Sequence, residues 1–223
     1  ITGEANVEPG CYYRDFEKAT LEKDLLLPCY TASKTINAVG GMVGNNSGGE
    51  KSSNYGQTKD WVTELRVVLS DGHEYVFSTM TKDKLDAKKM QNNFEGRLYH
   101  KMWNLISRNK DLIQSHKPKT DKNSAGYYLW DVWNEQENIF DLTKLLVGSQ
   151  GTLGLVTDIK FNLITPKKHS TLLVLFVDKL DKLGELVQQI NKFSPESTET
   201  YDEHTFKIAL KFWRSFLKQK GFL

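Results

Sequence analysis

The stretch Gly40-Gly41-Met42-Val43-Gly44-Asn45-Asn46-Ser47-Gly48-Gly49 is the most informative part of this sequence. It places five glycines and three small amide or hydroxyl side chains within ten residues. Glycine adopts positive φ without strain and lets a backbone approach a flat ligand, with its N–H groups free to face that ligand. We therefore predict that residues 40–49, called here the first glycine segment, form a ligand cradle.

A flexible linker is the alternative interpretation of such a run. Apolar side chains argue against it, because Val39, Met42 and Val43 are interleaved with the glycines and need a core to pack on. A second glycine segment, residues 145–157, reads Leu-Leu-Val-Gly-Ser-Gln-Gly-Thr-Leu-Gly-Leu-Val-Thr and has the same character. Neither segment carries a dinucleotide or phosphate-loop fingerprint. Two such cradles predict one extended ligand that is held at two points.

The composition is that of an ordinary globular protein, with 223 residues, 39% hydrophobic and 26% charged. A net charge of +2 gives no field that favours nucleic acid or anionic lipid. Two cysteines, Cys11 and Cys29, are too few for a disulfide framework or a four-ligand metal site. No apolar run reaches the roughly 18 residues of a membrane span. We expect a cytoplasmic protein without metal or transmembrane segment.

Periodicity predicts the order of the secondary structure. A hairpin is expected where residues 61–69 and 74–77 flank Asp71-Gly72, and a strand over residues 153–164. Helices are predicted over residues 12–26, 82–117, 140–146 and 180–193 and from about residue 203, with further strands over 171–177 and 198–201. Tyr99, Met102 and Trp103 are expected in the core. This order predicts an α+β fold with a mixed or antiparallel sheet flanked by helices.

Several motifs in order resemble those of FAD-linked oxidases. They are the first glycine segment, Asn54-Tyr55-Gly56, the hairpin at 65–75, Lys122-Asn123-Ser124-Ala125-Gly126-Tyr127, and the second glycine segment as far as Asp158. The set resembles the vanillyl-alcohol oxidase / para-cresol methylhydroxylase superfamily, nearest to its D-lactate, glycolate and D-2-hydroxyglutarate dehydrogenases. The resemblance implies the second FAD-binding subdomain in residues 1–166 and the beginning of a substrate-binding cap in residues 167–223. It implies a fragment without the upstream pyrophosphate-loop subdomain.

The resemblance also assigns cofactor-binding residues. Those along the flavin are Thr31, Ser33, Ala38, Val39, Gly40 and Gly41. Those at its polar edge or the ribityl chain are Asn46, Ser47 and Gly48, and those at the adenosine half are Gln150, Gly151, Leu155 and Val156. Relatives carry Thr-Ile at Ala38-Val39 and Glu at Gln150. The first glycine segment contains no histidine that could tether the flavin, so noncovalent binding is expected.

The implied reaction transfers hydride from a 2-hydroxy acid to FAD, and a separate acceptor then reoxidises the flavin. A flavin requires position and exclusion of water more than acid chemistry from its host, which agrees with the absence of a triad or carboxylate-pair motif. No catalytic base is assigned. The alternative is a noncatalytic nucleotide-binding or protein-interaction module of the same fold. A reductase of cell-wall precursors in the same superfamily matches the loop at 122–127 less well.

Overall fold

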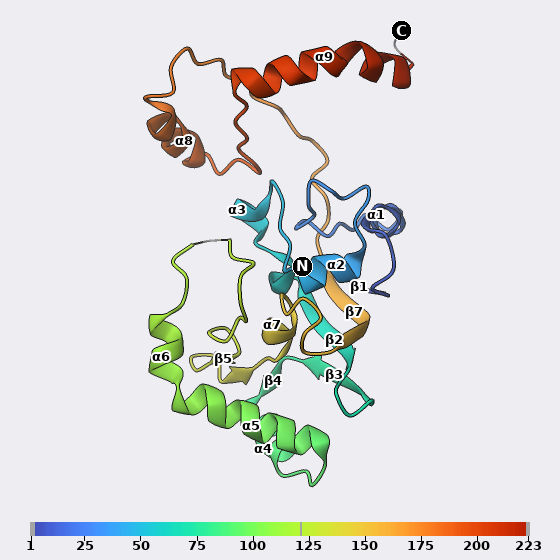
Figure 1. Cartoon of the computed structure of the whole chain (residues 1–223), viewed down its shortest axis with the longest axis vertical. Helices are drawn as coiled ribbons and strands as arrows, with labels where there is room; N and C mark the ends of the chain where they lie inside the picture. The colour runs from blue at the N-terminus through green and yellow to red at the C-terminus, as the bar shows by residue number, and fades with distance from the viewer. Residues whose placement is uncertain (1–2, 121, 222–223) are drawn as a thin grey trace. The chain divides into compact units, whose positions relative to one another are not determined.

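The computed structural model describes residues 3–120 and 122–221. It divides into two units, of which one ends at Asp178 and the other begins at Lys179 (Figure 1). The first unit combines antiparallel sheets with flanking helices, which confirms the predicted α+β class. Each unit is described separately below.

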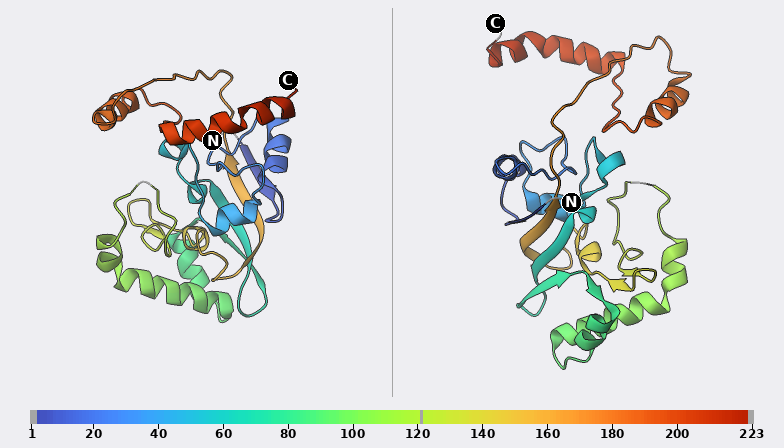
Figure 2. Two further views of the ribbon diagram at one scale, coloured as in Figure 1. Left: turned by 45° about the horizontal axis from the view of Figure 1, so that its top comes forward. Right: turned by 180° about the vertical axis from the view of Figure 1, so that it is seen from behind.

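A four-stranded antiparallel sheet forms the centre of the first unit, and Figure 2 shows it from two directions. Its order is β1 (Gly3–Val7), β7 (Leu155–Leu163), β2 (Val62–Val68) and β3 (Glu74–Ser78). Leu65 pairs with Phe77 on one side and Ile159 on the other, and all three side chains are buried. Such rows of apolar cross-strand neighbours set the register, because a slip of one residue would expose them.

The predicted hairpin and the predicted strand at 153–164 are both confirmed, as β2–β3 and β7. At the hairpin turn Gly72 has a φ of 80°, the conformation that glycine permits. The helix predicted over 12–26 is shorter, since α1 covers Tyr13–Leu21. It ends early because Leu26 instead exchanges backbone hydrogen bonds with Ile164, beyond β7. Phe16 of α1 packs on Phe161 of β7, with ring centroids 6.0 Å apart.

A second sheet carries the helices of the middle region. Its order is β4 (Met80–Thr81), β6 (Ile139–Phe140) and β5 (Trp133–Asn134). The single helical run predicted over 82–117 is three helices, α4 (Lys82–Lys89), α5 (Phe94–Arg108) and α6 (Lys110–Ser115). The first break comes at Asn93, whose Oδ1 accepts from Gly96 N at 2.8 Å and starts α5 as its N-cap.

The aromatic residues of α5 belong to the core, as predicted. Tyr99 is fully buried, and its ring lies 6.2 Å from that of Phe140. Trp103 and Met102 are partly buried against the same cluster. Because Phe140 is used in β6, the helix predicted over 140–146 begins later, as α7 (Thr143–Leu146). This cluster anchors the second sheet and α7, which leads directly into the second glycine segment.

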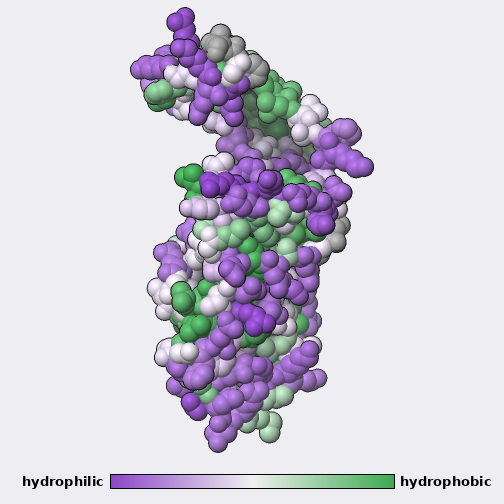
Figure 3. Space-filling model, turned by 90° about the vertical axis from the view of Figure 1, so that its right-hand side faces the viewer, coloured by the Kyte–Doolittle hydropathy of each residue, from purple (hydrophilic) through white to green (hydrophobic). Residues whose placement is uncertain are grey.

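The last part of the chain has helices, but none of its described residues from 171 to 221 is buried. α8 (Leu183–Asn191) and α9 (Glu203–Gln219) confirm the two predicted helices, and neither buries a residue. The strands predicted over 171–177 and 198–201 are wrong, because the structure gives neither segment a partner for its backbone groups. Among the described residues, none of the helices has the length and apolar character that crossing a membrane requires. On the face in Figure 3, hydrophobic residues are interspersed among hydrophilic ones.

Candidate functional site

The first glycine segment begins as a helix, not as an open loop. α2 covers Val39–Gly44, and its apolar residues Val39, Met42 and Val43 are all buried. Burial of this face overrides the weak helix propensity of glycine, and it also excludes the flexible-linker interpretation. The segment is therefore fixed against the core, as predicted.

The expectation of free N–H groups is wrong for α2 and for the turn after it as far as Ser47. Gly40 N donates to Pro9 O at 2.9 Å, and Gly41 N donates to Ala38 O at 3.1 Å. The N–H groups of Asn45, Asn46 and Ser47 donate to carbonyl groups one turn earlier. The helix satisfies its own backbone in this way because buried donors need partners. A ligand would therefore meet the surface of a short helix with small side chains.

The glycines of α2 and of the turn after it have different surroundings. A Cβ on Gly40 would lie 2.5 Å from Pro9 Cβ, and one on Gly49 would lie 2.1 Å from Tyr30 O, so internal packing accounts for both. Gly41 is exposed, and a Cβ there would meet no atom within 4 Å. Alanine would favour the helix at this position by roughly 1 kcal/mol. The bare surface at Gly41 thus fits close approach by a planar group from outside.

The second glycine segment lies directly against the first. Gly148 N donates to Val43 O and Gln150 N donates to Gly44 O, both at 2.8 Å. Gly148, Gln150 and Gly151 all have positive φ, with values of 87°, 53° and 75°. This unusual backbone turns the segment toward the end of α2. Two segments about a hundred residues apart in sequence are therefore joined by backbone hydrogen bonds, and the hypothesis of a single extended ligand requires this proximity.

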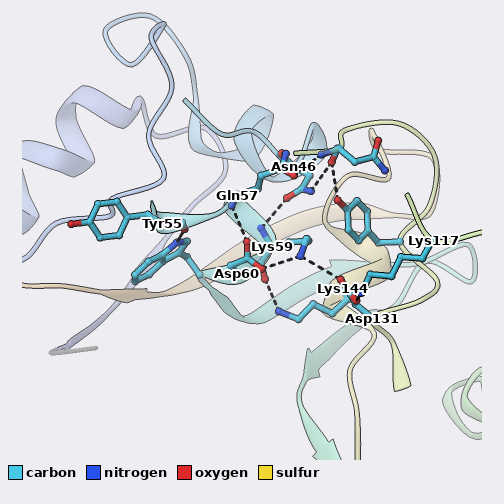
Figure 4. A network of polar contacts seen from close by, with 11 residues as sticks. Asn46, Tyr55, Gln57, Lys59, Asp60, Lys117, Asp131 and Lys144 are labelled. Carbon is cyan, nitrogen blue, oxygen red and sulfur yellow. Dashed lines mark hydrogen bonds and ion pairs between the residues drawn. The ribbon is translucent and has the colours of Figure 1, made fainter. Parts of the chain in front are cut away.

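A buried polar network joins the loop at 122–127 to the same place (Figure 4). Asn46, with a φ of 46° and no exposed surface, donates from Nδ2 to Asn123 O at 3.3 Å. Gln57 donates from Nε2 to Asn46 O at 2.7 Å, and its Oε1 accepts from Asn123 N at 2.9 Å. Its Nε2 also lies 3.2 Å from Ser124 Oγ. Both amide side chains therefore hold protein segments together.

Gln57 was not predicted as a site residue. It lies between α3 (Ser52–Tyr55) and the short 3₁₀ helix η1 (Thr58–Asp60), directly after the Asn54-Tyr55-Gly56 motif. Its position beside that motif is a sequence signal, but only the structure shows that its side chain is buried and faces Asn46. Gln57 also starts η1, since its N–H donates to Asp60 Oδ2 at 2.8 Å.

The remaining predicted residues fall in two groups. Thr31 and Ser33 lie in the loop before α2 with their hydroxyl oxygens 2.9 Å apart, and the backbone at Tyr30–Thr31 packs on Gly49. Ala38 is the N-cap of α2, while Ser47 and Gly48 follow its end. Leu155 and Val156 instead begin β7 and pair with Val68 and Val67 of β2. The structure thus gathers the first group around α2 and places the second at the hairpin end of the sheet.

A separate cavity of about 760 Å³ lies between η1, helices α5 and α6, and the β5–β6 hairpin. Among the described residues, its lining includes no member of either glycine segment. Several of its charges are matched within the protein, since Lys59 and Lys117 both contact Asp131. Paired charges of this kind indicate no particular ligand. The same described residues contain no group of three or more His, Cys, Asp and Glu arranged to hold a metal.

The buried cysteine beside this region is chemically quiet. Burial raises the pKa of the Cys29 thiol to about 12, although a hydrogen bond with Thr58 lowers it. A thiol that stays protonated at neutral pH is a poor nucleophile. Cys29 therefore acts as a small apolar residue of the core.

Comparison with known proteins agrees with this geometry. A family model described as an FAD binding domain matches residues 1–78. D-2-hydroxyglutarate dehydrogenase of Escherichia coli (strain K12) is 28% identical over 171 residues, which cover 77% of this chain and 17% of that protein. Glycolate oxidase subunit GlcD of Bacillus subtilis (strain 168) is 30% identical over 207 residues, covering 92% of this chain and 33% of that protein.

A D-lactate dehydrogenase of Archaeoglobus fulgidus is 24% identical over 203 residues, covering 91% of this chain and 34% of that protein. The chain thus spans between 17% and 34% of the length of these three relatives. The cofactor named by the family model is FAD. These findings support the FAD-linked oxidase family and, within it, the branch of the 2-hydroxy acid dehydrogenases.

Proposed function

We propose that the chain is part of an FAD-dependent oxidoreductase that oxidises a 2-hydroxy acid such as D-lactate, glycolate or D-2-hydroxyglutarate. The observation that carries the proposal is the joining of the two glycine segments through the Gly148–Val43 and Gln150–Gly44 hydrogen bonds. These hydrogen bonds bring together two motifs that the resembled family uses to bind its cofactor. The names of the three relatives support the substrate class.

The residues around α2 would hold the flavin portion of FAD. Gly41 offers a bare helix surface, while Thr31 and Ser33 supply hydroxyl groups in the loop that precedes α2. Asn46 is fully buried and bonded within the protein, so its role in the proposal is to shape the turn that carries Ser47 and Gly48. Gln150 and Gly151, both exposed and with positive φ, would face the adenosine half together with Leu155 and Val156.

FAD held by these residues would supply the hydride acceptor, and its reoxidation would need a separate electron acceptor. The contribution of this chain is to position the ring, to pack small residues against it and to exclude water from one side. No histidine lies in the first glycine segment, so the attachment in this proposal is noncovalent. Because the chain covers between 17% and 34% of these relatives, the whole reaction, its base and its acceptor are properties proposed for the longer protein.

Titration of the purified chain with FAD tests the proposal directly. We expect saturable quenching of flavin fluorescence at a ratio of one FAD per chain, and weaker binding of riboflavin, which lacks the adenosine half. Equal affinity for ADP and FAD would favour the noncatalytic nucleotide-binding module. Failure to bind any of the three, in a chain with a cooperative unfolding transition, would contradict a flavin site within these residues.

The substrate class is tested in the protein that contains the complete site. Anaerobic mixing with D-lactate, glycolate or D-2-hydroxyglutarate should bleach the flavin absorbance, whereas the L-enantiomers of the chiral acids serve as controls. No bleaching by any of these acids would contradict the proposed substrate class while leaving FAD binding intact.

A further inference from the structure

Lys59 occupies an unusual position beside the site. Its ammonium group lies 2.9 Å from Asp60 Oδ1 and 3.3 Å from Asp131 Oδ2, and only 16% of its side chain is exposed. It also lies 5.0 Å from the centre of the Tyr128 ring, a distance suited to a cation–π contact. Asp131 and Tyr128 belong to the chain that continues from the loop at 122–127. The side chain of Lys59 therefore contacts this region at two points.

The backbone of the same residue joins two other segments (Figure 4). Lys59 N donates to Asn46 Oδ1 at 2.9 Å, which links it to the first glycine segment. Lys59 O accepts from Lys144 Nζ at 2.6 Å, and Lys144 belongs to α7, which leads into the second glycine segment. One residue thus bonds to the first glycine segment, to Asp131 and to the helix that precedes the second glycine segment.

A substitution can remove the ammonium charge of Lys59 and leave the backbone hydrogen bonds of this residue in place. Burial by itself lowers the pKa of Lys59, but the hydrogen bond to Asp60 and the charges of Asp60 and Asp131 raise it overall. The ammonium group therefore stays charged at neutral pH. Its loss would leave Asp131 with Lys117, at 3.2 Å on the more exposed side. A partly buried ion pair that loses one member destabilises its surroundings more than an exposed one does.

We propose that Lys59 is a positioning residue whose ammonium group holds residues 122–131 against the two glycine segments. Its effect on flavin binding rests on the proposed function, whereas its effect on residues 122–131 does not. The ordered network of Asn46, Gln57 and Asn123 depends on this region, because Asn123 both donates to Gln57 and accepts from Asn46. Release of residues 122–131 would therefore open the polar network under the first glycine segment.

Hydrogen exchange measured by mass spectrometry tests the proposal on the whole chain, with and without FAD. Lys59→Met removes the charge and keeps most of the aliphatic stem, while Lys59→Arg retains the charge. Lys117→Met is the matched control, since it removes the outer partner of the same aspartate. We expect backbone exchange in peptides from residues 122–131 to be at least about tenfold faster in Lys59→Met, with near-native rates in the other two variants.

Peptides from β2 and β7 separate a local effect from general loss of stability. Their exchange should remain native in Lys59→Met if Lys59 acts on residues 122–131. Faster exchange throughout the sheet, or equal changes in Lys59→Met and Lys117→Met, would overturn the proposal. If the exchange pattern is as expected while native protein fails to bind FAD, the flavin assignment fails and the positioning role of Lys59 stands.

Discussion

The body of the chain and the part that follows residue 170 contain similar side chains in different surroundings. Val39, Leu65 and Ile159 are fully buried in the body. In the later part, Leu172 is 85% exposed and Phe176 is 92% exposed, although both belong to an apolar run that predicted a strand. α9 forms there nevertheless, without burying a residue. A helix satisfies its backbone within itself, whereas a strand needs a neighbour, and this difference separates the two regions.

Truncating one aromatic residue in each region gives the largest expected contrast. Phe161→Ala removes a fully buried ring that packs on Phe16, so we expect a loss of about 3–5 kcal/mol in the free energy of unfolding. Phe206→Ala in α9, where the side chain is 58% exposed, should change it by less than about 0.5 kcal/mol. Urea unfolding followed by circular dichroism measures both. Equal losses would show that α9 packs into a core in solution.

Two neighbouring glycines of α2 allow a comparison of a packed and an exposed position within the body. Gly40→Ala drives a Cβ against Pro9 and should destabilise the fold by about 1–3 kcal/mol. Gly41→Ala meets no protein atom, so we expect it to stabilise the fold by about 0.5–1 kcal/mol and to weaken FAD binding at least about tenfold. Thermal unfolding and flavin fluorescence report the two effects. Unchanged FAD affinity in Gly41→Ala would remove Gly41 from the site.

The smallest expected contrast compares the side-chain caps of two helices. Asn93 caps α5 and Asp202 caps α9, each through a backbone N–H donor at 2.8 Å. Asn93→Ala should lower the stability of the body by about 1 kcal/mol. Asp202→Ala should leave the unfolding of the body unchanged and reduce only the helicity of α9. Urea unfolding measures the first effect, and NMR chemical shifts of residues 203–219 measure the second.

Asp202 also predicts a pH dependence for α9. Its pKa is lowered from 3.8 chiefly by the hydrogen bond from the Thr205 backbone, because that bond favours the carboxylate. A lowered pKa means that the stabilisation is present above pH 3.8 and is lost as the pH falls through the lower, folded-state value. Asp202→Asn, which caps without titrating, is the control. An identical acid response in both proteins would exclude a role for this carboxylate.

The sequence predicted those elements whose pattern and turn chemistry are local. The hairpin follows from alternation around Asp71-Gly72, and α9 from an amphipathic period that begins after Asp202. The sequence pattern could not show where the helical region 82–117 is interrupted. The N-cap at Asn93 is a single polar residue between two stretches that both have a helical pattern. The pattern also could not show that residues 171–177 lack a strand partner.

For the candidate site, the sequence by itself supplied the two glycine segments, and its residues 1–78 match a model described as an FAD binding domain. Only the tertiary structure decided that the first segment is a buried helix and that Gly148 and Gln150 bond to its carbonyl groups. It also brought Gln57 and Lys59 to the same place. The physical reason is that a high glycine content widens the range of conformations open to the backbone. Burial and long-range hydrogen bonds then select the conformation that the backbone adopts.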